Sequence, residues 1–263
     1  MQKIIFLDLD GTLFDVPRGL LKPTDKTKKT ISQLKDNGHI VLICSGRCKC
    51  LLDDFIFNLK PSGYVLGNGT YFELDGKEIF NDKFNDDIME NMCEYIINHD
   101  GVPFCEGQKY IYVPDLNNYL FKEFISSWHI NETIFKDTKQ DKDFNMMMAA
   151  FNREEDRRSF ALHFKNQADI VNQYGFISVD INKLGFNKGS AVKKVLDYFN
   201  INKKNAYAFG DGINDIEMMQ EVYNSYAMDN ACMKLKQVSR FVAPDVLEDG
   251  FYQVMLKEGL IKE

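Results

Sequence analysis

The sequence predicts an α/β protein, in which helices cover both faces of a mostly parallel sheet and an α+β domain is inserted. Residues 1–81 and 184–263 alternate apolar runs of strand length with helical patterns. Residues 82–183 lack this alternation, and their apolar runs are further apart. About 100 residues are enough for a separate domain. We therefore expect a core domain formed by both ends of the chain and an inserted domain between them.

Strands and helices alternate in the N-terminal segment. Thr24 is a suitable N-cap, and Asn37-Gly38 would stop the helix that follows it. A second helix is expected over Cys48–Leu59, closed by Pro61, and Asp75-Gly76 predicts a hairpin. The expected strands are Ile4–Asp8, His39–Ser45, Tyr64–Leu66, Tyr71–Leu74 and Lys77–Phe80.

The C-terminal segment repeats the alternation, whereas the middle segment reads mainly as strands. Helices are expected over Ser190–Phe199 and Ile213–Glu221. The expected C-terminal strands are Ala206–Phe209, Ser225–Met228 and Phe241–Ala243. The expected strands of the middle segment are Lys109–Val113, Phe144–Asn152, Phe160–Phe164 and Phe176–Ile181.

The composition is that of an acidic globular protein. The chain has 263 residues, 44% of them hydrophobic, and this length buries a sizeable core without disulfides or metals. The net charge is −7 (32 Lys and Arg against 39 Asp and Glu). That balance argues against sequence-independent binding to nucleic acid or to anionic membranes, which needs a basic face. An anionic substrate would therefore need positive charge supplied locally.

No apolar run is long enough for a membrane span. The first apolar run carries Asp8 and Asp10 and no cleavage site follows it, so a secretory signal is not expected. The six cysteines show no framework spacing, which indicates free thiols in a reducing cytoplasm. Cys48 and Cys50 form a C-x-C pair without a second pair, and we reject a metal site there.

The strongest chemical pattern is the segment Asp8–Leu13, which ends the first expected strand. Ligands of open α/β sheets bind at the carboxyl ends of the strands. Asp8 and Asp10 would lie on one face of a regular strand, where two carboxylates repel unless a cation or proton joins them. Mg²⁺ would resolve that repulsion, because it prefers oxygen ligands. The alternative is a strand that merely ends in a polar turn.

A second acidic pattern follows the expected strand Ala206–Phe209. Asp211 and Asp215 are candidate metal ligands, and Asn214 can offer an amide N–H to a phosphoryl oxygen. Taken alone, this pattern fits equally well a helix N-terminus whose acids favour the helix dipole.

Two further segments could hold a phosphate. Ser45 and Gly46 come at the start of an expected helix, where a hydroxyl and free backbone N–H groups form an anion seat. A plain Ser N-cap explains them equally well in isolation. Lys188 precedes another expected helix, where its charge opposes the helix dipole, and this favours a role with an anion. A solvated surface lysine is the alternative.

The four patterns together, in this order, resemble the haloacid dehalogenase-like phosphatases, specifically Cof-type hydrolases with a type IIB cap. The matching segments are DLDGTL (8–13), CSGR (44–47), the Lys of NKGS (187–190), FGDGIND (209–215), AMDNA (227–231) and EDGFYQVM (248–255). The resemblance covers essentially the whole chain. It implies a Rossmann-like catalytic core and an inserted α+β cap between the second and third motifs.

The resemblance also implies a mechanism. Asp8 would attack phosphorus and become an aspartyl-phosphate. Asp10 would protonate the leaving alcohol and then deprotonate the hydrolytic water. The carboxylates of Asp8 and Asp211 and the main-chain carbonyl of Asp10 would hold Mg²⁺. Asp215 would order the waters of the metal or the Asp211 side chain.

The same resemblance assigns the phosphate ligands. Ser45, Gly46, Lys188 and Asn214 would hold the transferring phosphoryl group, and Ser45 stands where the family often has Thr. Phosphoryl transfer asks for positioning and for compensation of charge on those oxygens. Lys188 and Mg²⁺ would supply that charge locally in an acidic protein.

The implied function is a Mg²⁺-dependent phosphatase of small phosphorylated metabolites, such as sugar phosphates. A phosphohexomutase is an alternative, because it shares core and cap class; it would need a second phosphate site, for which Arg153, Arg157 and Arg158 are candidates. A non-enzymatic phospho-ligand sensor is an alternative of another class. Neither nucleic acid nor a membrane is expected as a partner, and the oligomeric state is open.

Overall fold

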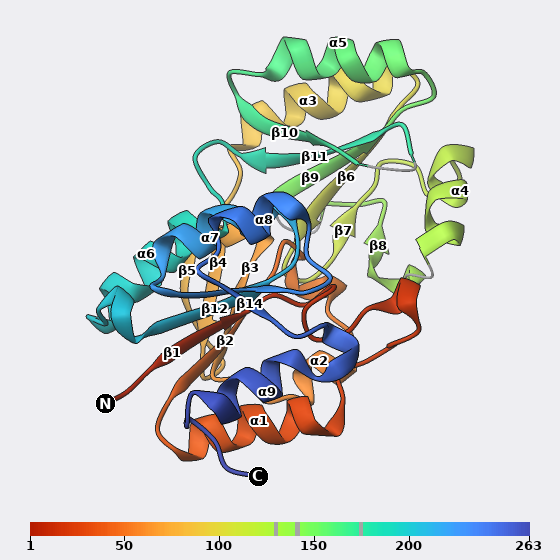
Figure 1. Cartoon of the computed structure of the whole chain (residues 1–263). Helices are drawn as coiled ribbons and strands as arrows, with labels where there is room; N and C mark the ends of the chain where they lie inside the picture. The colour runs from red at the N-terminus through yellow and green to blue at the C-terminus, as the bar shows by residue number, and fades with distance from the viewer. Residues whose placement is uncertain (129–130, 140–142, 174–175) are drawn as a thin grey trace. The chain divides into compact units, whose positions relative to one another are not determined.

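The computed structural model describes residues 1–128, 131–139, 143–173 and 176–263, drawn in colour in Figure 1. Two compact units are present. The first unit comprises Met1–Gly46, Leu52–Phe80 and Asn187–Glu263, and the second comprises Arg47–Leu51 and Asn81–Phe186. The predicted boundaries, 1–81 with 184–263 and 82–183, place residues 47–51, 81 and 184–186 in the core, whereas these residues belong to the second unit. The division into domains remains a prediction.

The sheet of the first unit has eight described strands, in the order β14-β13-β12-β1-β2-β3-β4-β5. They are β1 (Ile4–Leu7), β2 (Ile40–Cys44), β3 (Gly63–Leu66), β4 (Tyr71–Leu74), β5 (Lys77–Asn81), β12 (Ala206–Gly210), β13 (Asn224–Met228) and β14 (Phe241–Ala243). The strands from β14 to β3 run parallel, and β4 is antiparallel to β3. This confirms the predicted α/β class with a mostly parallel sheet.

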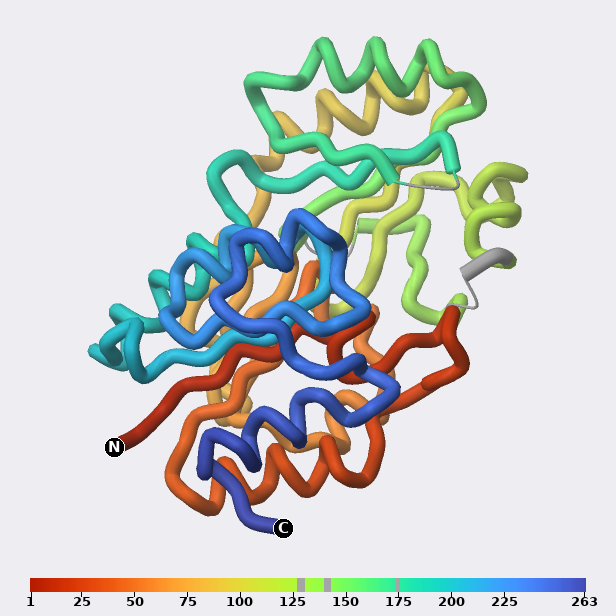
Figure 2. The backbone as a smooth tube through the Cα atoms, in the orientation of Figure 1, coloured from red at the N-terminus to blue at the C-terminus, as the bar shows by residue number. Residues whose placement is uncertain are grey.

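Helices cover both faces of this sheet, as Figure 1 shows. The helices on one face are α1 (Asp25–Asp36), α2 (Asp54–Phe57) and α9 (Gly250–Lys257). The helices on the other face are α6 (Lys188–Phe199), α7 (Ile216–Glu221) and α8 (Met233–Val238). In Figure 2, α1 and α9 lie side by side although they come from opposite ends of the chain, and the Asn37 amide donates to the Leu260 carbonyl beside them (2.8 Å).

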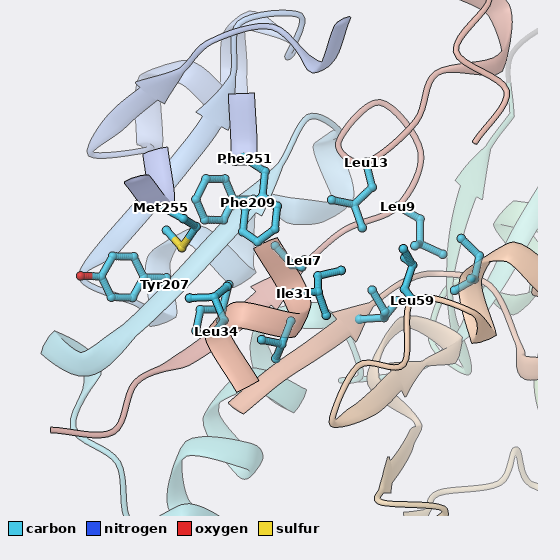
Figure 3. Packing of buried hydrophobic residues seen from close by; sticks show 14 of the residues in the cluster. Leu7, Leu9, Leu13, Ile31, Leu34, Leu59, Tyr207, Phe209, Phe251 and Met255 are labelled. Carbon is cyan, nitrogen blue, oxygen red and sulfur yellow. The ribbon is translucent and has the colours of Figure 1, made fainter. Parts of the chain in front are cut away.

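The central strand β1 is apolar throughout because both of its faces are buried. Ile5 and Leu7 belong to the cluster under α1 and α9, and Ile4 and Phe6 to the cluster under α6 and α7. Figure 3 shows Leu7 in the first cluster, among the labelled side chains of Ile31, Leu34, Phe209 and Phe251. Such continuous apolar runs are typical of parallel strands between two helix layers. This packing fixes the strand whose end carries Asp8.

The second unit is an α+β arrangement around a six-stranded sheet, in the order β10-β11-β9-β6-β7-β8 among the described strands. The strands are β6 (Val102–Gly107), β7 (Ile111–Tyr112), β8 (Phe135–Lys136), β9 (Phe144–Ala150), β10 (Ala168–Asn172) and β11 (Ser178–Lys183). The helices α3 (Asp86–Asn98) and α5 (Glu154–Phe164) cover one face, and α4 (Tyr119–Trp128) packs on the other. None of the helices in the described part of the chain is long and apolar enough to span a membrane.

Two expected elements are wrong. Phe160–Phe164 lies in α5 instead of a strand, because Phe160 and Phe164 are one helical turn apart and both face the same apolar cluster. The expected helix Cys48–Leu59 is divided into a 3₁₀ turn (Lys49–Leu51) and the short helix α2. Leu51 packs in the apolar core of the second unit, and Leu52 packs in that of the first. Because the apolar side chains of this run pack in two different cores, they do not form one face of a continuous helix.

Candidate active site

Three neighbouring strands bring the predicted site residues to one edge of the sheet in the first unit. β1 lies between β12 and β2 and runs parallel to both, so their carboxyl ends meet. Asp8 follows β1, and its backbone N–H donates to the Phe209 carbonyl at the end of β12 (3.0 Å). Ser45 follows β2, and Asp211 follows β12. This is the edge at which ligands of open α/β sheets bind.

A buried ion network joins the segments 8–13, 187–190 and 209–215. The Lys188 Nζ donates to Asp8 Oδ1 (2.5 Å) and to Asp215 Oδ1 (2.6 Å). The Lys188 side chain is 1% exposed and that of Asp215 is fully buried. A lysine is almost never buried to this extent unless it is paired. The sequence-based alternative of a solvated Lys188 is therefore wrong.

Burial and charge act in opposite directions on this network. Burial alone would lower the pKa of Lys188, but the Asp215 and Asp8 carboxylates raise it above its ordinary value, so the ammonium stays charged. Burial and then the Asp215 carboxylate raise the pKa of Asp8 well above its usual range, against the opposing effect of Lys188. One lysine thus faces a surplus of buried carboxylates.

The loop after β12 is held by Asp215. Its Oδ2 accepts hydrogen bonds from the backbone N–H groups of Asp211 and Gly212 (3.0 Å each), while its Oδ1 accepts from Lys188. The Asp211 carboxylate lies against Gly11, where a Cβ would come 2.1 Å from Asp211 Oδ2. A glycine is required at position 11, since its φ of +72° is also left-handed.

The carboxylates of Asp8, Asp211 and Asp215 form a group that could hold a metal ion. One oxygen of each lies within 4.8 Å of the others. Burial, followed by the Asp215 charge, raises the pKa of Asp211 to about 7. A cation at this place would relieve the repulsion between the carboxylates, and their all-oxygen donor set suits a hard divalent ion. The residues present therefore fit a divalent metal.

Asp10 and Asp215 differ from each other in their placement relative to this cluster. The Asp10 side chain is exposed and is not part of the carboxylate cluster. This agrees with the prediction that Asp10 would contact the metal through its main-chain carbonyl. The Asp10 charge also raises the pKa of Asp211, but by less than burial and the Asp215 charge. Asp215, expected behind the ligands, offers an oxygen within the cluster itself.

The predicted phosphate ligands are gathered near the same edge. Ser45 is buried, and its backbone N–H donates to the Val65 carbonyl (2.9 Å). The Asn214 amide nitrogen lies 3.6 Å from where a Cβ of Gly46 would stand. The structure therefore brings Gly46 and Asn214 together, although they are far apart in the sequence.

Sequence reasoning assigned no role to Thr12 or Asn230, which both hold the loop after β1. The Thr12 hydroxyl donates to Asp8 Oδ2 (3.4 Å). The Asn230 amide donates to the Gly11 carbonyl (2.7 Å), and its Oδ1 accepts from the Val246 N–H (3.2 Å). The only sequence feature that points to them is their place in two of the matching segments, Thr12 in DLDGTL and Asn230 in AMDNA.

The arginines that a phosphohexomutase would need for a second phosphate site are engaged in α5 and at its N-cap, and Arg157 also donates to Asn172 of β10. Arg153 pairs with Asp156 (2.7 Å), and both Arg157 and Arg158 pair with Glu154. These pairs are local, between residues three or four positions apart on one helix. No observation at these arginines favours a second phosphate site.

Comparison with known proteins identifies the family. Residues 5–255 match the family model of the haloacid dehalogenase-like hydrolases. YkrA of Bacillus subtilis (strain 168) is 27% identical over 263 residues, covering 99% of each chain. The 5-amino-6-(5-phospho-D-ribitylamino)uracil phosphatase YcsE of the same organism is 26% identical over 252 residues, covering 94% of this chain and 92% of YcsE.

A solved structure shares the fold. The HAD subclass IIB sugar phosphatase BT4131 superposes with a TM-score of 0.81 at 23% identity, covering 98% of this chain and 100% of that one. The fold and the acidic site therefore define a phosphatase-type α/β hydrolase. The chain belongs to the haloacid dehalogenase-like hydrolase family, which confirms the resemblance to its Cof-type phosphatases and the prediction of an enzyme, a phosphoric monoester hydrolase.

Proposed function

We propose that this protein is a Mg²⁺-dependent phosphatase that hydrolyses small phosphomonoesters through an aspartyl-phosphate on Asp8. The buried network of Asp8, Lys188 and Asp215, with Asp211 beside it, is the observation that carries this proposal. It combines a carboxylate nucleophile with fixed positive charge at a strand end, which is what phosphoryl transfer needs.

The proposed reaction has two steps on Asp8. A carboxylate oxygen of Asp8 attacks phosphorus, the bond to the leaving oxygen breaks, and Asp10 gives that oxygen a proton. Asp10 then takes a proton from water, which attacks phosphorus and releases phosphate and the free Asp8 carboxylate. The exposure of the Asp10 side chain is compatible with both transfers, because each exchanges a proton with a group that comes from solvent.

Positive charge and hydrogen-bond donors would stabilise the transferring group. Ser45, the backbone at Gly46, Lys188 and Asn214 would hold its oxygens, and the Thr12 and Lys188 hydrogen bonds orient the Asp8 carboxylate. Mg²⁺ would be held by the carboxylates of Asp8 and Asp211 and by the Asp10 main-chain carbonyl, and it would supply further positive charge to the transferring group. The Asp215 hydrogen bonds to the backbone would keep the Asp211 loop in place.

The proposed substrates are sugar phosphates or related metabolites. BT4131 is described as a sugar phosphatase and YcsE as a phosphatase of a phosphoribityl compound, which supports a phosphorylated polyol or sugar here. The cap-like second unit, proposed as an inserted domain at 82–183, would carry leaving-group specificity. A reducing, cytoplasmic setting is also proposed, since the six cysteines are all free.

The test is release of inorganic phosphate from a panel of phosphorylated metabolites, with Mg²⁺ and with chelator. Wild type should release phosphate only with Mg²⁺, and Asp8→Asn should be inactive. Asp197→Asn is the matched control, because Asp197 is an exposed aspartate of α6 in the same unit. Activity in Asp8→Asn, or the same rate in chelator, would contradict the proposal.

A further inference from the structure

The turn Gly67-Asn68-Gly69 after β3 has an uncommon backbone. All three residues have left-handed φ angles, of +58°, +50° and +91°. Thr70 closes the turn, because its hydroxyl and its N–H both bond to the Gly67 carbonyl (2.8 and 3.2 Å). Asn is one of the few residues besides glycine that adopt this conformation readily. Non-glycine residues with left-handed backbone angles are often found at functional sites.

This turn lies beside the predicted phosphate seat. β3 runs parallel to β2, with Val65 opposite Cys44, so the carboxyl end of β3 is next to Ser45 and Gly46. A Cβ at Gly46 would come 3.0 Å from Asn68 Oδ1 and 3.5 Å from Asn68 Nδ2. The Asn214 amide nitrogen borders the same point at 3.6 Å. Two carboxamides, from Asn68 and Asn214, therefore flank Gly46.

The turn also packs against the helix that carries Lys188. A Cβ at Gly69 would come 2.6 Å from the Asn187 carbonyl oxygen and 2.6 Å from the Ala191 Cβ. Asn187 is the N-cap of α6, and Lys188 follows it. Asn68 is thus held by a turn fitted between the start of α6 and the Ser45–Gly46 segment.

We propose that Asn68 is a further ligand of the substrate, with its amide N–H donating to a phosphoryl oxygen. The inference rests on the proposed phosphatase function and adds a residue to it. A carboxamide supplies a donor without adding another charge to a site that already contains several. The left-handed turn after β3 explains how Asn68 comes beside the Ser45–Gly46 segment that follows β2.

Two substitutions test this role. Asn68→Asp keeps the size and the backbone preference of the side chain but replaces the donor with a negative charge. Asn68→Gly keeps the left-handed turn and removes the side chain. Asn200 is the matched control position, because it ends α6 with φ +52° and ψ +42°, is exposed, and is not part of the site.

The measurements are calorimetric binding of orthophosphate in the presence of Mg²⁺ and hydrolysis of p-nitrophenyl phosphate. We expect both Asn68 variants to lose about ten- to a hundredfold in phosphate affinity and in kcat/KM, Asn68→Asp the more, as a lost hydrogen bond to a charged group predicts. Melting temperatures should match those of Asn200→Asp and Asn200→Gly, whose binding and kinetics should equal wild type.

The outcomes separate this inference from the proposed function. Wild-type affinity and kcat/KM in both Asn68 variants would overturn the role of Asn68 and leave the phosphatase intact. A wild type that binds orthophosphate but hydrolyses nothing would overturn the phosphatase, while weaker binding by the variants would still support Asn68. A wild type that neither binds nor hydrolyses would overturn both.

Discussion

At the scale of single residues, Lys188 is the centre of the site. It is the cation that faces Asp8 and Asp215 in the buried network, and all three side chains are inaccessible or nearly so. Buried charges of this kind are costly unless each has its partner. In the proposed mechanism, the same ammonium would also compensate charge on the phosphoryl group. Stability and catalysis would then both depend on this one side chain.

Lys188→Met tests this double role. It leaves Asp8 and Asp215 buried without their cation, so we expect a loss of about 3–5 kcal/mol in the free energy of unfolding. We also expect kcat to fall by about 10²–10³-fold, as for other lost charge-stabilising groups. Urea unfolding and steady-state kinetics measure both. Lys193→Met, at an exposed position of the same helix, should change neither, and a similar result for Lys188→Met would refute this role.

At the scale of elements, the first turn of α6 places Lys188. The Asn187 side chain accepts from the Ser190 N–H (2.8 Å), and the Ser190 hydroxyl accepts from the Asn187 N–H (3.1 Å). This reciprocal capping box satisfies backbone donors that the helix leaves unpaired. It fixes the direction in which the helix begins, immediately before the lysine. A local cap thus determines the geometry of a buried ion network.

Asn187→Ala should therefore affect both folding and rate. The lost cap predicts a destabilisation of about 1 kcal/mol, and the looser start of α6 predicts a lower kcat. Thr24→Ala is the comparison, because the Thr24 side chain also caps a helix, α1, by accepting from the Thr27 N–H (3.2 Å), and it donates besides to Asp249 Oδ1 (2.6 Å). It should lose similar stability at full kcat. Equal kcat in the two variants would contradict a positioning role for the α6 cap.

At the scale of the whole molecule, sequence periodicity predicted several helices and strands. It did not predict the ion pairs that Lys188 forms with Asp8 and Asp215. Alternating strands and helices predicted the first unit well, down to β14 at Phe241–Ala243. The four motifs predicted which residues gather at one edge. No pattern indicated that Lys188 would pair with Asp215, because that contact depends on how α6 and α7 pack. The sequence predicted a turn at Gly67-Asn68-Gly69 but no role for Asn68. The left-handed backbone of Asn68 and its contacts with distant segments become visible only in the folded structure.

The second unit carries a titratable group of its own. Burial, and then the charge of Asp180, raises the pKa of Glu106 from 4.5 to about 8. Burial also raises the pKa of Asp180 to about 6, although a hydrogen bond from Gln173 acts in the opposite direction. The folded state thus keeps a proton on Glu106 where the unfolded chain has lost it. Stability should therefore fall as pH rises from about 4.5 to about 8.

Glu106→Gln should flatten this dependence and stabilise the second unit at pH 8, by on the order of a few kcal/mol. Amide hydrogen exchange in β6 and β9, followed from pH 5 to pH 8, measures the local effect. Glu123→Gln, at an exposed glutamate of α4, should keep the wild-type pH dependence. An unchanged pH dependence in Glu106→Gln would refute the raised pKa of that carboxyl.

The proposed mechanism transfers a phosphoryl group from the substrate to Asp8. The most direct measurement is mass spectrometry of peptides after acid quench during turnover, in wild type and in Asp10→Ala. We predict one added phosphoryl group on the peptide that contains Asp8, and its accumulation in Asp10→Ala, whose turnover should fall by about 10²–10⁴-fold. A phosphoryl group on another residue, or rapid turnover by Asp10→Ala with no trapped intermediate, would contradict the account.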